Sequence, residues 1–201
     1  MPKAFSMNES AHIKEALIHE AMVCLKQYGV KKTTVDDLVE RVGIAKGSFY
    51  RFYPSKEHLF YDVFRREHDA IQARFLMFVE KDSSELNADV LTEMVFNALK
   101  YAEDSVIFSL MARNELEMLM RKLPPALHED HHQQDALSMM ALMKKFPKVN
   151  PKRFEAYVGA FRLAMSGIMQ KQSIGSDCFD EALKLTIKGI FIQLIEENNH
   201  D

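Results

Sequence analysis

Apolar residues recur at spacings of three and four along almost the whole chain, which is the pattern of amphipathic α-helices. Short breaks containing Gly, Pro and Ser separate the periodic segments. The pattern predicts nine helices, over residues 11–28, 35–42, 46–52, 56–80, 88–102, 105–122, 126–145, 151–171 and 177–197. Seven Gly and six Pro are too few for the turns of an all-β protein, and no strand pattern is sustained. We therefore expect an all-α fold.

The helix lengths suggest two domains of different size. Residues 11–60 hold one longer and two short helices, with a helix-turn-helix at about 34–53, whereas 61–201 holds mostly long helices.

The net charge also differs between these two parts of the chain. Residues 1–60 carry nine Lys/Arg and seven Asp/Glu, a net +2, and 61–201 carry 17 and 22, a net −5. The overall charge of −3 therefore does not exclude nucleic acid as a partner, because the N-terminal part is locally basic.

Composition excludes several classes of protein. The two cysteines, Cys24 and Cys178, are too few for a small protein held together by several disulfides. No uncharged run exceeds eight residues, so no segment is predicted to span a bilayer. Because no apolar stretch of signal-peptide type follows Lys3, we expect a cytoplasmic protein.

The segment from residue 32 to 59 carries the most specific pattern. Thr33 and Thr34 precede a short helix with acidic residues in its first turn, where a hydroxyl can cap free amides and acids suit the helix dipole. That helix ends at Gly43, and another begins near Lys46 after a three-residue connection. Two short helices joined in this way are typical of a helix-turn-helix.

The second helix begins with residues suited to a phosphodiester backbone. Lys46, Gly47 and Ser48 provide a cation, a position without a side chain and a small hydroxyl, which allow close approach of the helix start. Tyr50, Arg51 and Tyr53 add hydrogen-bond donors. Lys56 follows the turn at Pro54–Ser55, where it can meet a phosphate.

The run Gly43-Ile44-Ala45-Lys46-Gly47-Ser48-Phe49-Tyr50-Arg51-Phe52-Tyr53-Pro54-Ser55-Lys56-Glu57-His58-Leu59, with Thr33-Thr34 upstream, resembles the DNA-binding domain of TetR-family transcriptional regulators. The resemblance covers about residues 29–60. It implies that Thr33 or Thr34, Tyr50 and Lys56 contact phosphates, that residues 46–48 lie at the major-groove end of the recognition helix, and that Phe49 packs inward.

Two positions depart from the family pattern. Ala45 stands where Ser or Thr is usual, which removes a side-chain cap worth about 0.5–2 kcal/mol. Tyr53 stands where Phe is usual, which preserves packing and offers a hydrogen bond to phosphate. A purely structural alternative exists for Thr34, as an N-cap, and for Arg51, as a solvated surface charge.

Methionine is concentrated in the second half of the chain, where eight of the 13 follow residue 100. Flexible Met side chains line adaptable apolar pockets, and they also fill ordinary cores. A pocket for an apolar or aromatic effector would draw on Phe75, Phe108, Met111, Met139, Met143, Phe161 and Met165. The alternative is a plain Met-rich core.

The last two long helices carry broad apolar faces with small residues that allow close helix approach. By resemblance they would pair across a two-fold axis as a four-helix bundle, through Phe154, Tyr157, Phe161, Phe179, Leu183, Ile187, Ile190 and Leu194. The alternative is an antiparallel helix pair inside one chain.

The cluster His128-Glu129-Asp130-His131-His132 has no third ligand apart from it, so neither a metal site nor a cofactor is expected. The sequence predicts a dimeric, ligand-responsive repressor that binds a pseudo-palindromic operator in double-stranded DNA and is not an enzyme. The alternatives are a DNA-binding regulator without a small-molecule response and an all-α metal protein or enzyme that uses the His128 cluster.

Overall fold

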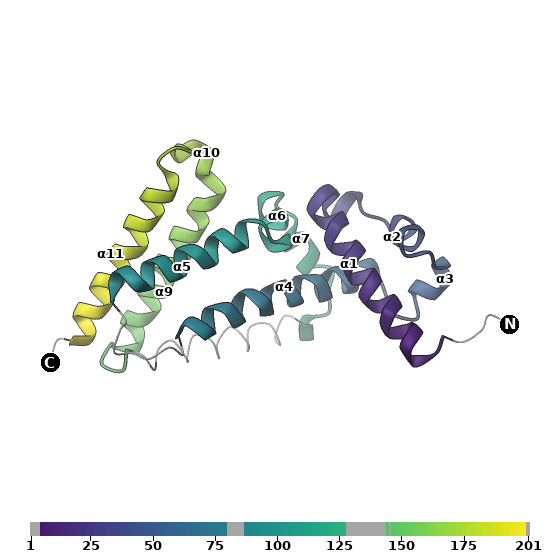
Figure 1. Cartoon of the computed structure of the whole chain (residues 1–201), viewed down its shortest axis with the longest axis horizontal. Coiled ribbons are helices and arrows are strands. Elements are labelled where there is room, and N and C mark those ends of the chain that lie inside the picture. The colour runs from purple at the N-terminus through teal and green to yellow at the C-terminus, as the bar shows by residue number, and fades with distance from the viewer. Residues whose placement is uncertain (1–4, 80–86, 128–143, 145, 200–201) are drawn as a thin grey trace. The chain divides into compact units, whose positions relative to one another are not determined.

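The computed structural model describes residues 5–79, 87–127, 144 and 146–199, without the side chains of 75, 76, 78 and 79. Every regular element in these ranges is a helix, so the predicted all-α class is confirmed (Figure 1). Within the same ranges, no helix is long and apolar enough to cross a membrane.

The chain divides into two compact units. The first comprises Met1–Asp69 and Asp104–His131, and the second Ala70–Glu103 and His132–Asp201. The first unit holds α1 (Met7–Lys32), α2 (Val35–Val42), α3 (Lys46–Phe49), the start of α4 (Lys56–Val79), α6 (Val106–Ala112) and α7 (Leu116–Met120). The second holds the end of α4, α5 (Ala88–Glu103), α9 (Pro151–Gly167), the 3-10 turn η2 (Ile168–Gln170), α10 (Lys171–Ile174) and α11 (Phe179–Asn199).

The core of the first unit begins with one apolar face of α1. Leu17, Ala21, Cys24 and Leu25 are buried there. They pack in one cluster with α2, α3 and the first turns of α4, including Phe49 and the buried side chains Leu38, Leu59, Phe60, Val63 and Phe64. Burial raises the pKa of the Cys24 thiol, which makes it a packing residue.

The same core extends to residues far along the chain. Val106, Leu110, Leu119 and Leu123 belong to it, so α6 and α7 are part of the first unit. The expected domain boundary at residue 60 therefore differs from the observed division, because these downstream helices bury the apolar side chains of α1 and α4.

The predicted helix at 105–122 is two helices instead. It begins as expected, with the Ser105 hydroxyl accepting from the Phe108 amide. The chain then turns at Asn114, whose φ is +54°, and continues as α7. A left-handed backbone position cannot continue an α-helix. The predicted helix at 126–145 falls almost entirely outside the described residues.

In the second unit, α11 packs against both α5 and α9. Figure 1 shows α9 and α11 running in opposite directions, joined through α10. Ion pairs fasten α5 to α11, between Asp89 and Lys188 (2.6 Å), Glu93 and Lys184 (2.6 Å), and Lys100 and Asp180 (3.2 Å). Their order along the two helices shows that α5 and α11 are antiparallel.

Candidate nucleic-acid interface

The helix-turn-helix forms where the sequence predicted it. Thr34 caps α2 by accepting from the Asp37 amide, and the Asp37 carboxylate accepts from the Thr34 amide (2.9 Å), a reciprocal capping box. The Thr34 hydroxyl also donates to the Asp37 carboxylate, and this hydrogen bond, followed by that from the Thr34 amide, lowers the pKa of Asp37. At the other end of α2, Gly43 takes the left-handed conformation (φ 73°, ψ 33°) that turns the chain toward α3.

The start of α3 is exposed and has no side-chain cap. Ala45 occupies the N-cap position and makes no side-chain hydrogen bond, which confirms the expected consequence of this departure from the family pattern. Lys46 and Gly47 are exposed, and Ser48 is half-buried. Lys46 Nζ lies 2.9 Å from the Asp36 carboxylate, and this contact raises the pKa of Lys46.

Gly47 has no steric reason to be glycine within the chain. Its φ is not positive, and a Cβ built on it meets no atom within 4 Å. Gly inside a helix is less stable than Ala by about 0.5–1 kcal/mol. The absence of a side chain therefore suits an external partner that approaches the backbone of α3.

Replacing Gly47 by Ala should move stability and DNA binding in opposite directions. We expect the free energy of unfolding to rise by up to about 1 kcal/mol, because Ala favours the helix. We expect DNA affinity to fall, because the methyl group stands where a phosphodiester would approach. Denaturant unfolding and titration of a DNA duplex measure the two effects, and unchanged or tighter DNA binding would contradict this role for Gly47.

The aromatic residues of α3 and of the turn after it differ in exposure. Phe49 is fully buried, as expected, and Tyr50 lies edge-on to it at a centroid distance of 5.4 Å. The Tyr50 side chain is 52% exposed, so its hydroxyl can meet a partner. Arg51 is exposed and stacks over Phe5, with 5.2 Å between the guanidinium carbon and the ring centroid.

The hydroxyl of Tyr53 is engaged within the protein, whereas the sequence had suggested that it faces a phosphate. Its side chain is only 6% exposed, and its hydroxyl donates to Asp62 at 2.8 Å. Burial, followed by this hydrogen bond, raises the pKa of Tyr53. Tyr53 therefore packs like the Phe it replaces and ties the turn to α4.

Thr33 and Thr34 also have separate roles. Thr33 is buried, and its hydroxyl donates to the Gly29 carbonyl at 2.7 Å. Thr34 is exposed and is the N-cap of α2, so of the two threonines it is the one that a phosphate could reach.

Lys56 has an internal role that the sequence did not reveal. Its ammonium group donates to the carbonyls of Val30 (3.0 Å) and Thr33 (2.7 Å), and burial lowers its pKa. Two of its three N–H donors are used in these bonds. The predicted phosphate contact would use the third.

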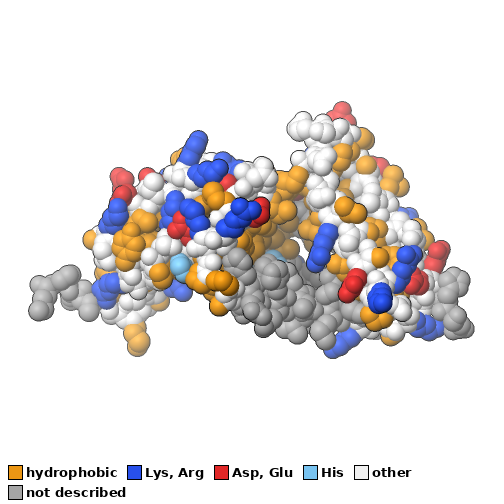
Figure 2. All heavy atoms as spheres, turned by 180° about the vertical axis from the view of Figure 1, so that it is seen from behind, with side chains coloured by type: hydrophobic (Ala, Val, Ile, Leu, Met, Phe, Trp, Pro, Cys, Tyr) orange, Lys and Arg blue, Asp and Glu red, His pale blue; other side chains and the backbone are white. Residues whose placement is uncertain are grey.

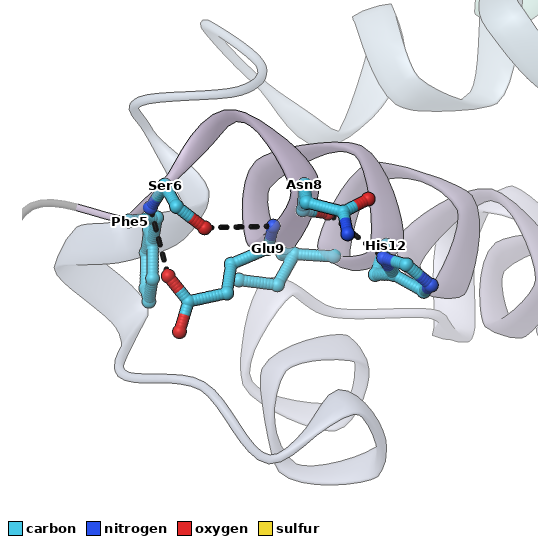
Figure 3. A pocket seen from close by; sticks show the side chains of 6 residues that line it. Phe5, Ser6, Asn8, Glu9 and His12 are labelled. Atoms are coloured by element: carbon cyan, nitrogen blue, oxygen red, sulfur yellow. Dashed lines mark hydrogen bonds between the residues drawn. The ribbon is translucent and has the colours of Figure 1, made fainter.

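On the face drawn in Figure 2, Lys and Arg side chains lie among apolar and acidic ones. A shallow hollow opens at the start of α1, lined by Phe5, Ser6, Asn8, Glu9, His12 and Ile13 (Figure 3). Ser6 and Glu9 cap the helix reciprocally, and the His12 ring lies 2.8 Å from the Asn8 carbonyl oxygen, so these polar groups are engaged within the helix.

Comparison with known proteins agrees with this geometry. Residues 17–63 match the family described as "Bacterial regulatory proteins, tetR family". The N-terminal domain is a tetR-family domain. No curated protein matches the sequence.

Solved TetR-family structures share the fold of nearly the whole chain. A regulator from Mesorhizobium loti MAFF303099 is 14% identical with a TM-score of 0.67, and one from Marinobacter aquaeolei VT8 is 14% identical with a TM-score of 0.62. In both comparisons 92% of this chain and 97% of the other are covered. RolR in complex with resorcinol is 15% identical with a TM-score of 0.53, covering 98% and 97%. The chain therefore has a TetR-like fold.

Within this TetR-like fold, most residues predicted at a dimer interface are buried inside one chain. Phe154, Tyr157, Phe179, Leu183, Ile187 and Leu194 are all buried. Ile190 and Phe161 are half-buried, and Phe161 packs on Phe191 at 5.0 Å between ring centroids. The buried set belongs to the packing of α5, α9 and α11, so the alternative of a helix pair inside one chain describes it.

Other apolar side chains on the same two helices are exposed. Leu163 on α9 is 74% exposed, and Leu185 and Ile192 on α11 are 63% and 39% exposed. Leu185, Gly189 and Ile192 share one face of α11 by their spacing. Cβ atoms added at Gly159 and Gly189 would meet nothing within 4 Å, so open space adjoins both glycines.

The residues that the sequence predicted for an effector pocket, where the structure describes them, belong to both units. Phe108 is half-buried and Met111 exposed in the first unit, whereas Phe161 is half-buried and Met165 exposed in the second. The Phe75 side chain and both Met139 and Met143 lie outside the described residues, as does the cluster from His128 to His132. Among the side chains that are described, none form a group of three or more metal-ligand types.

Several side chains contact the helix-turn-helix or the end of α1, and the sequence did not predict these contacts. Asp36 is one of the acidic residues in the first turn of α2, and its position one helix before Lys46 does not by itself predict the ion pair. Asp62, Arg113 and Glu115 lie farther along the chain, and their contacts with the N-terminal helices follow from the packing of α4, α6 and α7.

Proposed function

We propose that this protein is a transcriptional repressor that binds a pseudo-palindromic operator as a homodimer and responds to a small effector. The observation that carries this proposal is the exposed start of α3, with Lys46, Gly47 and Tyr50 on a tetR-family helix-turn-helix. These residues offer a cation, an unobstructed backbone and a hydroxyl donor. They support a binding protein rather than an enzyme.

The role that we propose for each residue at the DNA follows from its chemistry and its exposure. Lys46, Gly47 and Ser48 would enter the major groove, where a lysine can recognise guanine. Thr34, Tyr50, Arg51 and Lys56 would contact phosphates, which fix the position of the domain without reading sequence. Asp36 would hold Lys46 beside α3 until DNA replaces it.

Dimerisation would bring two such domains to one operator. The exposed residues Leu163, Leu185 and Ile192, with glycines beside them, support a second copy of this chain as the partner of α9 and α11. The contact would be isologous, so that wherever residue i of one copy meets residue j of the other, residue j of the first also meets residue i of the second. The recognition helices would then read half-sites about 34–36 Å apart, or one or more further turns apart.

The effector is proposed to be small and apolar or aromatic. The fold that this chain shares with RolR, solved with resorcinol, and the Met residues of the second half support this class. The effector would act through α4, which passes from the first unit to the second. It can change DNA affinity only by binding the DNA-bound and free conformations unequally.

Selection of operators from a random DNA pool tests the DNA-binding function. Enrichment of a pseudo-palindrome, with an affinity that falls steeply as salt rises, is the expected result. Failure to enrich any sequence would overturn the proposal of a sequence-specific regulator. A set of small phenols can then be screened by thermal shift, since a ligand specific to the folded state raises the melting temperature.

Tyr50 and Tyr53 provide a matched pair for the same chemical change. Tyr50→Phe should weaken operator binding about 2- to 10-fold, the loss expected for one hydrogen bond, and leave stability unchanged. Tyr53→Phe should lower the free energy of unfolding by about 1 kcal/mol and leave DNA affinity unchanged, because its hydroxyl donates to Asp62. Equal effects of the two changes on DNA affinity would contradict the assignment.

A further inference from the structure

Helix α1 is interrupted just before it leads into the helix-turn-helix. Gly29 has φ 78° and ψ −178°, which are not helical values, and one more turn follows it to Lys32. Thr33 and Thr34 then connect directly to α2. The direction in which α2 leaves α1 therefore depends on how this interruption is held.

The interruption removes two backbone hydrogen bonds from α1. In a continuous helix the amide of Val30 would donate to the carbonyl of Lys26, and the amide of Lys31 to that of Gln27. An unpaired buried backbone group is costly, so the amide of the buried Val30 in particular needs another acceptor.

Two side chains from the corner between α6 and α7 replace these bonds. The Glu115 carboxylate accepts from the amides of Val30 (2.7 Å) and Lys31 (3.4 Å). The Arg113 guanidinium donates to the carbonyls of Lys26 and Gln27, both at 3.1 Å. The carboxylate thus takes the two donors and the guanidinium takes the two acceptors, with the Ser109 hydroxyl also donating to the Lys26 carbonyl (3.4 Å).

The fit between this corner and the interruption is close. Glu115 is buried, with 6% of its surface exposed, and it would collide with a Cβ at position 29. Lys56 holds the other end of the short turn through the carbonyls of Val30 and Thr33. An acid at the amide end of the turn and a cation at its carbonyl end also match its dipole.

We infer that Arg113 and Glu115 are positioning residues for DNA binding, which set the angle between α1 and the helix-turn-helix. The inference rests on the DNA-binding function proposed above. It makes operator affinity depend on a corner that lies 85 residues downstream of the segment that it holds. All the residues involved belong to the first unit.

Glu115→Gln in the full-length protein tests this role. The change keeps the size of the side chain but loses the charge and places an amide group against one of the backbone N–H donors. We expect operator affinity to fall about tenfold, as for loss of a charge-assisted hydrogen bond, and hydrogen exchange at Val30 and Lys31 to accelerate. Exchange at Leu17–Cys24 should remain slow.

Leu119→Ala is the matched control, because Leu119 is fully buried in α7 and belongs to the same core. Both variants are measured at a temperature where circular dichroism shows them folded. The control should bind the operator within about twofold of the unmodified protein, since backbone contacts with α1 are retained. Equal loss in both variants, or no loss in Glu115→Gln, overturns the inference.

Arg113 gives a second variant that avoids a buried position. Arg113 is exposed, so Arg113→Gln should fold, with a three- to tenfold loss of operator affinity, and Arg113→Lys should recover part of it. Unchanged affinity in Arg113→Gln would also overturn the role of Arg113. If the unmodified protein binds no duplex, the proposed function fails, whereas binding that no variant alters defeats only the positioning role.

Discussion

Replacing Leu185 and Ile192 together by lysine should convert the protein from a dimer to a monomer and lower its affinity for a two-half-site operator by about 100-fold or more. Both side chains lie on one exposed face of α11, so the folded chain tolerates the change. In the proposed dimer the same positions are covered by a second copy, where four introduced charges would be buried without partners.

The size of the effect on DNA follows from linkage of two binding events. A dimer that has bound one half-site holds its second domain beside the other, which raises the overall affinity by a factor of about 10²–10⁴ over a single domain. The variant should therefore bind a single half-site as well as the unmodified protein does. Burial of one leucine contributes about 1.5–3 kcal/mol, and each of these side chains occurs twice in the dimer.

Sedimentation velocity over a range of concentrations measures the oligomeric state, and duplexes with one or two half-sites measure the affinities. Val90→Lys is the control, because Val90 is a similarly exposed apolar residue (40%) on α5 of the same unit. It should leave both measurements unchanged. A double variant that still sediments as a dimer would place the dimer interface elsewhere, and an unmodified protein that is monomeric would remove the dimer altogether.

The sequence predicted best those parts of the fold that depend on neighbouring residues. Thr34 and Gly43 mark the ends of α2 through local hydrogen bonds and a left-handed turn, and both roles are confirmed. The spacing of apolar residues predicted the helix at 11–28, because a single face of α1 packs on the core. The family motif predicted that Phe49 packs inward, and Phe49 is buried whereas Tyr50 is exposed.

Roles that depend on distant partners could not be predicted in the same way. Apolar residues such as Phe154, Tyr157 and Leu194 give the same sequence pattern whether they pack within one chain or against a second copy. Here they are buried within their own chain. Tyr53 and Lys56 carry polar groups that either DNA or the protein could satisfy. The Tyr53 hydroxyl donates to Asp62, and the Lys56 ammonium group donates to two backbone carbonyls. No pattern in the motif indicates these hydrogen-bond partners.

Gly29 is the position where a distant partner has the largest consequence for stability. We expect Gly29→Ala to lower the free energy of unfolding by about 2–6 kcal/mol, from two sources of about 1–3 kcal/mol each. The first is backbone strain, because φ 78° with ψ −178° is a region that only glycine occupies readily. The second is displacement of the Glu115 carboxylate, which leaves the buried amide of Val30 without its acceptor.

Gly43→Ala separates these two contributions, because Gly43 also has a positive φ (73°) but a Cβ there meets nothing within 4 Å. It should cost only the strain of a left-handed residue, about 1–2 kcal/mol. Urea denaturation of both variants and of Gly29→Ala with Glu115→Ala completes a double-mutant cycle. Because the shorter side chain that Glu115→Ala introduces leaves room for the new methyl group, the double variant should be less destabilised than the sum of its single changes. Strictly additive effects, or equal costs at Gly29 and Gly43, would show that Glu115 does not restrict position 29.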